Sequence, residues 1–199
     1  MDEEVPEARQ REGCLQSTHI LYMSLQSKDY NIYCDLNMNL KDKFHDIFNR
    51  LDEKLFQENE GRRQSGALLI SPVKIMVLGQ TALLLADLPF PVAGTMDLDA
   101  RINGDTLARK MLSEILLPEG LYLESDDHLI WVPKEANYEE WHKGNLLAVF
   151  VAEAVAVIAS KAKFKRAKDK GIVRMYLQHF PDSEQRLQEW GVSAKWVYS

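Results

Sequence analysis

Apolar residues first recur at helical spacing in the stretch from residue 39 to residue 61. They stand three or four positions apart with polar residues between them, at Leu40, Phe44, Ile47, Phe48, Leu51 and Leu55. This spacing predicts an amphipathic helix that packs one face on a core, with Asn39 as its N-terminal cap and Asp42 in its first turn. Residues 1–35 lack such a pattern and begin with a run of charges. They predict a peripheral or poorly ordered segment ahead of a domain that spans residues 36–199.

Patterns typical of strands dominate residues 67–151. The apolar run at residues 73–78 ends at Gly79 and predicts a buried strand. Residues 95–102 alternate polar and apolar side chains, as a strand with one exposed face does. The other elements expected here are helices at residues 81–86 and 106–115, the second capped by a turn at residues 103–105, a hairpin at residues 121–124 and 128–132, and a strand at residues 146–151.

The last part of the chain, residues 152–190, is expected to be helical. Residues 152–170 begin apolar and end strongly basic, which predicts one helix that Gly171 ends or kinks. Further helices are expected at residues 172–180 and from a cap at residues 182–183 to Trp190. The order of elements predicts an α+β domain, a mixed sheet flanked by helices with a helical C-terminal end.

Composition narrows the function classes. The 199 residues hold 24 Lys and Arg against 30 Asp and Glu, and this acidic balance argues against a protein that coats DNA. It does not exclude nucleotides, because a metal ion can bridge carboxylates to phosphates. Two cysteines without a ligand pattern, no signal-peptide pattern and no apolar run that spans a bilayer predict a cytoplasmic protein that does not enter a membrane.

The segment with the most chemical content is Gly94 to Asp99. On a strand, Asp97 and Asp99 point to the same face, while Met96 and Leu98 would point into the core. Two neighbouring carboxylates repel each other unless a cation lies between them, and Mg²⁺ or Mn²⁺ prefers such oxygen ligands. The alternative is a solvated strand face on which Arg101 neutralises one aspartate.

Two further segments could bind phosphate. Gly79 lies between a predicted strand and a predicted helix, and a glycine there lets the backbone approach an anion. Gln80 and Thr81 follow it at the start of the helix. The alternative is an ordinary turn from strand to helix. In the basic run near residue 165, Lys161, Lys165 and Lys168 would share a helical face that binds a triphosphate or an RNA backbone. The alternative there is a solvated face with a Lys165–Asp169 ion pair.

In this order and spacing, the three motifs resemble the DNA polymerase-beta-like nucleotidyltransferase superfamily. Within it, the chain is most similar to small bacterial nucleotidyltransferases that include abortive-infection toxins and minimal nucleotidyltransferases. The resemblance covers roughly residues 40–180. The matched features are the first amphipathic helix, the strand that ends at Gly79-Gln80, the strand Thr95-Met-Asp-Leu-Asp99, and the helix with Lys161, Arg166, Lys168 and Asp169.

The resemblance implies metal-dependent transfer of a nucleoside monophosphate from an NTP to a protein, tRNA or small-molecule acceptor. By the same resemblance, Asp97 and Asp99 would be the catalytic residues and hold Mg²⁺, and Gly79, Gln80 and Thr81 would meet the triphosphate. Lys161 would contact the nucleotide, with Asp169 as its partner in the cleft. Such chemistry depends mainly on positioning and electrostatics.

The chain also departs from the family pattern. Gln80 stands where the family prefers Gly or Ser, and Ile172 stands where it often has a second aspartate. A catalytic member needs a third carboxylate on a neighbouring strand, and the sequence does not place one among Glu124, Asp127 and Glu135. A second hypothesis is therefore a catalytically inactive module of the same fold, antitoxin-like, that binds a partner protein or forms a homodimer.

Overall fold

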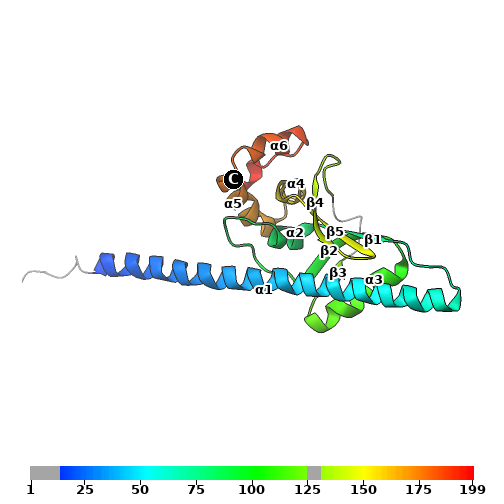
Figure 1. Ribbon diagram of the computed structural model, residues 1–199. Coiled ribbons are helices and arrows are strands. Elements are labelled where there is room, and N and C mark those ends of the chain that lie inside the picture. The colour runs from blue at the N-terminus through cyan, green and yellow to red at the C-terminus, as the bar shows by residue number, and fades with distance from the viewer. Residues whose placement is uncertain (1–13, 125–130) are drawn as a thin grey trace, which may run out of the picture.

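The computed structural model describes residues 14–124 and 131–199, with side chains from Leu40 onward. Its helices and strands form a mixed α/β domain, so the predicted α+β fold is confirmed (Figure 1). The helices are α1 (Cys14–Ser65), α2 (Gly79–Leu85), α3 (Thr106–Leu116), α4 (Ala154–Phe164), α5 (Lys170–His179) and α6 (Ser183–Glu189). The strands are β1 (Val73–Val77), β2 (Asp97–Asn103), β3 (Tyr122–Glu124), β4 (Tyr138–Lys143) and β5 (Leu147–Ala152).

The five strands form one mixed sheet in the order β3-β2-β1-β5-β4. The central strand β1 pairs antiparallel with β2 and parallel with β5, and its buried side chains alternate with exposed or partly exposed ones. β3 joins the edge next to β2 in parallel, and β4 joins the other edge in an antiparallel hairpin with β5. The strands predicted at residues 73–78, 95–102 and 146–151 are therefore present, with ends shifted by one or two residues.

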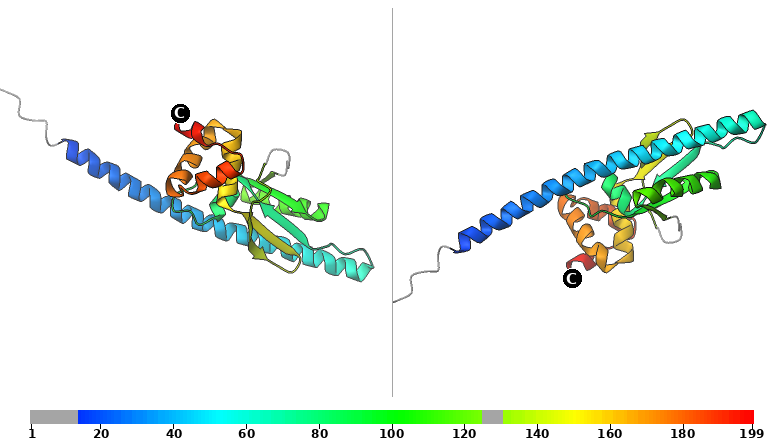
Figure 2. Two further views of the ribbon diagram at one scale, coloured as in Figure 1. Left: turned by 90° about the horizontal axis from the view of Figure 1, so that it is seen from above. Right: turned by 90° about the horizontal axis from the view of Figure 1, so that it is seen from below.

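Helices enclose this sheet from different sides. Along one side, α1 runs past the sheet in contact with α3 (Figure 1). The helices α4, α5 and α6 gather at one end of the sheet, as the views from above and below show (Figure 2). This arrangement leaves β2 and β3 facing the C-terminal helices across one end of the sheet, where the predicted site residues lie.

The helix α1 begins earlier than predicted. It runs without a break from Cys14, so Asn39 is an interior residue and not its N-terminal cap. The physical reason is that residues 14–60 contain no Gly or Pro, and an unbroken backbone ladder needs no polar cap. The sequence has little apolar periodicity before residue 39, so periodicity alone predicts this helix only from that point onward. The peripheral role and the domain boundary assigned to residues 1–35 stay predictions.

The predicted apolar face of α1 is confirmed, since Phe44, Ile47, Phe48, Leu51 and Leu55 are all fully buried in the core. Beside them lies Asp52, an aspartate that is only 7% exposed. Its carboxylate accepts backbone hydrogen bonds from Asn145, Leu146 and Leu147 at 2.7–2.9 Å, and one from the Asn145 side chain at 3.2 Å. This carboxylate fixes the β4–β5 turn to α1.

Asp52→Asn is expected to lower the free energy of unfolding by about 1–3 kcal/mol, because an amide NH₂ would face backbone N–H donors that lose their acceptor. Urea unfolding measures the change. Asp46→Asn is the matched control, since Asp46 lies on the same helix with an exposed side chain. Equal stability of the two variants would contradict the role given to Asp52.

The predicted single helix at residues 152–170 is wrong. α4 ends at Phe164, Lys165 adopts a left-handed conformation with φ of 52°, and a 3₁₀ turn at residues 167–169 precedes α5. The break carries Asp169 back toward Lys161, with which it forms a buried ion pair. Lys165 therefore does not share a helical face with Lys161 and Lys168, and the expected Lys165–Asp169 pair is replaced by this contact.

Other local predictions also need correction. The second half of the predicted hairpin lies largely outside the described residues, residues 131–132 are not in a strand, and the described partner of β3 is β2. β4 was not predicted, because exposed Glu139 and Glu140 interrupt any apolar alternation, as is common on edge strands. The cap predicted at residues 182–183 is only partly right: α6 begins at Ser183, but the side chain of Asp182 makes no capping hydrogen bond.

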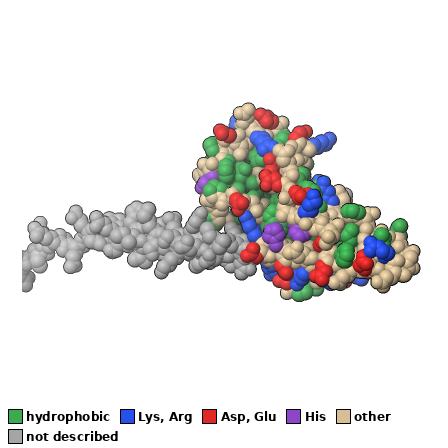
Figure 3. Space-filling model, in the orientation of Figure 1, with side chains coloured by type: hydrophobic (Ala, Val, Ile, Leu, Met, Phe, Trp, Pro, Cys, Tyr) green, Lys and Arg blue, Asp and Glu red, His purple; other side chains and the backbone are tan. Residues whose placement is uncertain are grey.

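Charges of both signs are interspersed over the face shown in Figure 3. Among the helices that the structure describes, none combines the length and apolar character that a bilayer crossing requires.

Candidate functional site

A cleft of about 740 Å³ lies where β2 and β3 face the C-terminal helices. Residues from four parts of the chain line it: the turn into α2, the loop before β2, the strands β2 and β3, and the segment from α4 to α5. Its lining includes Gly79, Gln80, Pro91, Ala93, Gly94, Thr95, Asp97, Asp99, Glu124, Val157, Ser160, Lys161, Phe164, Arg166, Lys168, Asp169, Gly171, Ile172 and Met175.

One wall of the cleft is acidic. Asp97 is exposed and Asp99 is half-buried, and both line the cleft from the same face of β2. In the parallel pairing of β2 with β3, Glu124 lies opposite Asp99, so its carboxylate joins the same face. Burial, together with the charges of Asp97 and Glu124, raises the pKa of Asp99, although the Gln80 N–H and Lys161 oppose the shift. Because these carboxylates disfavour the ionised form of Asp99, a cation bound beside them would stabilise that form.

The core side of β2 differs in one residue from the prediction. Leu98 is fully buried, but Met96 is 59% exposed. The reason is that β2 begins at Asp97, so Met96 still belongs to the preceding loop and does not follow the alternation of the strand.

The turn into α2 touches the acidic wall directly. Gly79 has φ of +57°, and a Cβ built on it would overlap the carboxylate of Asp99. The Gln80 backbone N–H donates to Asp99 Oδ2 at 3.3 Å. The Gln80 side chain turns to the loop instead, where Nε2 donates to the Ala93 carbonyl at 3.0 Å. Gln80 therefore connects the loop at Ala93 to the same turn that contacts Asp99.

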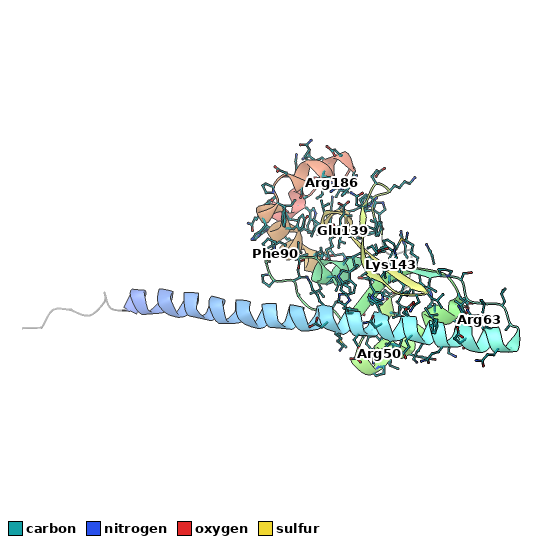
Figure 4. The ribbon with its side chains drawn as sticks, in the orientation of Figure 1. Arg50, Arg63, Phe90, Glu139, Lys143 and Arg186 are labelled. Atoms are coloured by element: carbon teal, nitrogen blue, oxygen red, sulfur yellow. The ribbon has the colours of Figure 1, made fainter. Side chains whose placement is uncertain are left out.

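That loop is also anchored from its other side. Phe90 is buried and packs against α5, with its ring centroid 4.8 Å from that of His179 and 6.3 Å from that of Tyr176 (Figure 4). Thr95 Oγ1 accepts the backbone N–H of Asp97 at 3.2 Å. The rim formed by residues 91–95 is thus held at both ends beside the carboxylates.

Gly79→Ala is expected to lower the free energy of unfolding by about 2 kcal/mol and to displace Asp99, because the left-handed backbone at this position strains any residue with a Cβ and the new methyl group overlaps the carboxylate. Thermal or urea unfolding measures the loss. Gly94→Ala is the matched control at the same cleft, since a Cβ there meets no atom within 4 Å. A loss of the same size in both variants would show that Gly79 has no special position.

The opposite wall is basic, with one buried cation and two exposed ones. Lys161 is only 7% exposed, and its Nζ donates to Asp169 Oδ1 at 2.9 Å. Arg166 Nε donates to Asp169 Oδ2 at 2.5 Å from a largely exposed side chain, and Lys168 is exposed at the rim. Burial would raise the pKa of Asp169, but the hydrogen bonds from Lys161 and Arg166 outweigh it and hold that pKa below its usual value.

The structure brings six of the seven predicted site residues to this cleft: Gly79, Gln80, Lys161, Asp97, Asp99 and Asp169. Thr81 is fully buried and does not line it; its hydroxyl donates to the Asp97 carbonyl at 2.8 Å and so supports β2 from behind. Glu135 lies in a turn away from the cleft, and Asp127 lies outside the described residues.

The predicted site does not include Glu124 or Arg166. The sequence names Glu124 without placing it, because only the parallel register with β2 sets it opposite Asp99. Arg166 enters only through its spacing from Lys161, and the clustering of basic residues there is the signal that favours it. Lys168 is expected to bind phosphate from the same helical face as Lys161, but the break after α4 is what brings both Arg166 and Lys168 to the cleft.

The donor set suits a hard divalent cation that arrives with phosphate. Within residues 14–124 and 131–199, no group of three or more His, Cys, Asp or Glu side chains forms a ready metal cage. Mg²⁺ rarely uses such a cage, because it keeps several waters and binds one or two carboxylates together with substrate phosphates. The neighbouring carboxylates of Asp97 and Asp99, with the raised pKa of Asp99, fit that kind of site.

Comparison of this chain with protein-family models, with curated proteins and with solved structures yields no match in any of the three.

Proposed function

We propose that this cleft binds a metal–NTP complex and transfers its nucleoside monophosphate to an acceptor. One observation carries the proposal: the carboxylates of Asp97 and Asp99 face Lys161, Arg166 and Lys168 across a single cleft. A cation on the acidic wall and phosphates between the two walls would neutralise both sets of charges. The sequence resemblance to nucleotidyltransferases supports the same assignment.

In the proposed step, an acceptor oxygen attacks the α-phosphorus of the NTP and forms a new P–O bond. The bond from that phosphorus to the bridging oxygen breaks, and pyrophosphate leaves with the electron pair. Glu124 would take the proton of the acceptor in this proposal, which its lining of the cleft opposite Asp99 supports. Mg²⁺, when bound, would offset the charge that develops on the phosphate oxygens. Arg166 and Lys168 would hold the departing pyrophosphate from the basic wall.

Labelled nucleotides test this step. We expect the full chain with Mg²⁺ or Mn²⁺ to move label from an α-³²P-NTP onto an acceptor in a fraction of RNA, protein or small molecules, and to release pyrophosphate. The same NTP labelled at the γ-phosphorus should leave the acceptor unlabelled. Transfer from the γ position alone would show a phosphoryl transferase and overturn the proposal.

One observation favours a second candidate, the inactive binding module. Lys161, expected to contact a nucleotide, is already paired with Asp169 in a buried ion pair. In this module the basic wall would be structural and the cleft would not bind NTP. Glu124 weakens this candidate, because it supplies a carboxylate on the neighbouring strand. Binding of Mg²⁺–NTP at micromolar affinity would eliminate it.

A further inference from the structure

Phe164 presents an exposed aromatic ring at the cleft. Its side chain is 46% exposed, although most large apolar side chains of the described chain are buried. None of the ring contacts found among the described residues involves it. It is the last residue of α4, and the left-handed Lys165 that follows turns the chain away. An apolar ring of this size that faces water inside a cleft is available to stack on a planar ligand.

The ring lies on the same stripe of α4 as the charged part of the site. Val157, Lys161 and Phe164 follow each other at spacings of four and three residues, and all three line the cleft. Phe164 therefore lies about 4.5 Å beyond Lys161 along the helix axis. Lys161 is close enough to Asp99 for its charge to lower the pKa of that aspartate. Moving along this wall, a ligand would meet the charges first and the aromatic ring next.

A second helix, α5, adds apolar side chains on the other side of the Lys161–Asp169 pair from Phe164, because it runs from Asp169 back toward Glu153 at the start of α4. Ile172 and Met175 are three residues apart on α5, so they share a face, and both line the cleft while remaining partly exposed. The cleft thus combines a polar section with charges of both signs and, one turn of α4 beyond Lys161, the ring of Phe164.

We propose that the end of α4 at this cleft is a nucleobase subsite in which Phe164 stacks on the base of the NTP. The inference rests on the proposed function, because it assigns the polar section to the metal and the phosphates. A nucleotide has the matching order of parts, a charged tail followed by a planar apolar face. Since every base offers such a face, stacking alone should accept all four NTPs.

The test compares two probes by isothermal titration calorimetry in the presence of Mg²⁺: α,β-methylene-ATP, and tripolyphosphate, which has no base. Phe164→Ala is expected to weaken binding of the methylene analogue about 5- to 100-fold, the usual effect of losing one base stack. Tripolyphosphate should bind this variant as well as it binds the parent chain. Phe164→Tyr, which keeps a ring, should retain the affinity of the parent chain for the analogue.

Phe56→Ala is the matched control, because Phe56 is also 46% exposed but lies on α1 and not at the cleft. It should leave the binding of both probes unchanged. If the parent chain binds the analogue and Phe164→Ala binds it equally well, the base subsite is wrong while the proposed function stands. If the parent chain binds neither probe, both proposals fail.

Discussion

Replacing Asp97 and Asp99 together by asparagine is expected to lower nucleotidyl transfer by about 10³-fold or more, because the two carboxylates that would hold the metal become neutral. Transfer of label from α-³²P-NTP, followed over time for parent and variant, measures the loss. Glu114→Gln, a change of the same kind at an exposed position on α3, should leave the rate unchanged. Transfer by the double variant at the rate of the parent chain would eliminate these aspartates as catalytic residues.

The double variant should lose nucleotidyl transfer without any decrease in the free energy of unfolding. The pKa of Asp99 is raised in the folded protein, chiefly by burial and by the charge of Asp97, so its ionised form disfavours folding. The metal-free parent chain should therefore gain stability as the pH falls through the raised pKa toward the ordinary value of 3.8. At neutral pH, the double variant should unfold at the same temperature as the parent chain or a higher one. A double variant that melts normally but transfers no label would show that these aspartates act in the reaction and do not stabilise the fold.

Asp169→Ala is expected to have the opposite effect, with a loss of about 3–5 kcal/mol in the free energy of unfolding. Removing this carboxylate leaves the buried ammonium group of Lys161 without its counter-charge, which proteins tolerate poorly. Urea unfolding at neutral pH measures the change. Asp182→Ala is the matched control, because Asp182 also lies among the C-terminal helices but makes no capping hydrogen bond.

Two further results would support this explanation. Replacing both partners, as Lys161→Met with Asp169→Leu, should recover most of the lost stability, since no charge is then left buried alone. In the parent chain, the low pKa of Asp169 stabilises the fold above the ordinary value of 3.8. That contribution should be lost as the pH falls through the lowered pKa. Equal stability of Asp169→Ala and Asp182→Ala would contradict the role of the ion pair.

Local patterns predicted much of the fold, because burial and secondary structure leave periodic signals. The apolar face of α1, the buried strand β1 and the pair Asp97–Asp99 on β2 all follow from spacing alone. The start of α1 was missed, since a helix without a core-facing stripe has no such signal. The break at Lys165 was missed as well, because a non-glycine residue in the left-handed region is uncommon and has no marker in sequence.

The cleft itself depends on contacts between distant parts of the chain, and these limit what the sequence can predict. Glu124 reaches Asp99 only through the register of β3 on β2. The basic run is expected from the sequence to form one helical face, but a break after α4 pairs Lys161 with Asp169. Gln80 is expected from the sequence to meet the triphosphate, but its side chain bonds to the loop at Ala93. In each case the decisive partner is far away in sequence or follows an unmarked turn.

The most direct test of the central claim is whether the two aspartates bind a metal–nucleotide complex. Isothermal titration calorimetry of Mg²⁺–α,β-methylene-ATP should show micromolar binding to the parent chain and at least about a hundredfold weaker binding to Asp97→Asn/Asp99→Asn. Chelation of Mg²⁺ should remove binding to the parent chain. Equal affinity of the two proteins, or no binding to the parent chain, would contradict the claim that this cleft is a metal–nucleotide site.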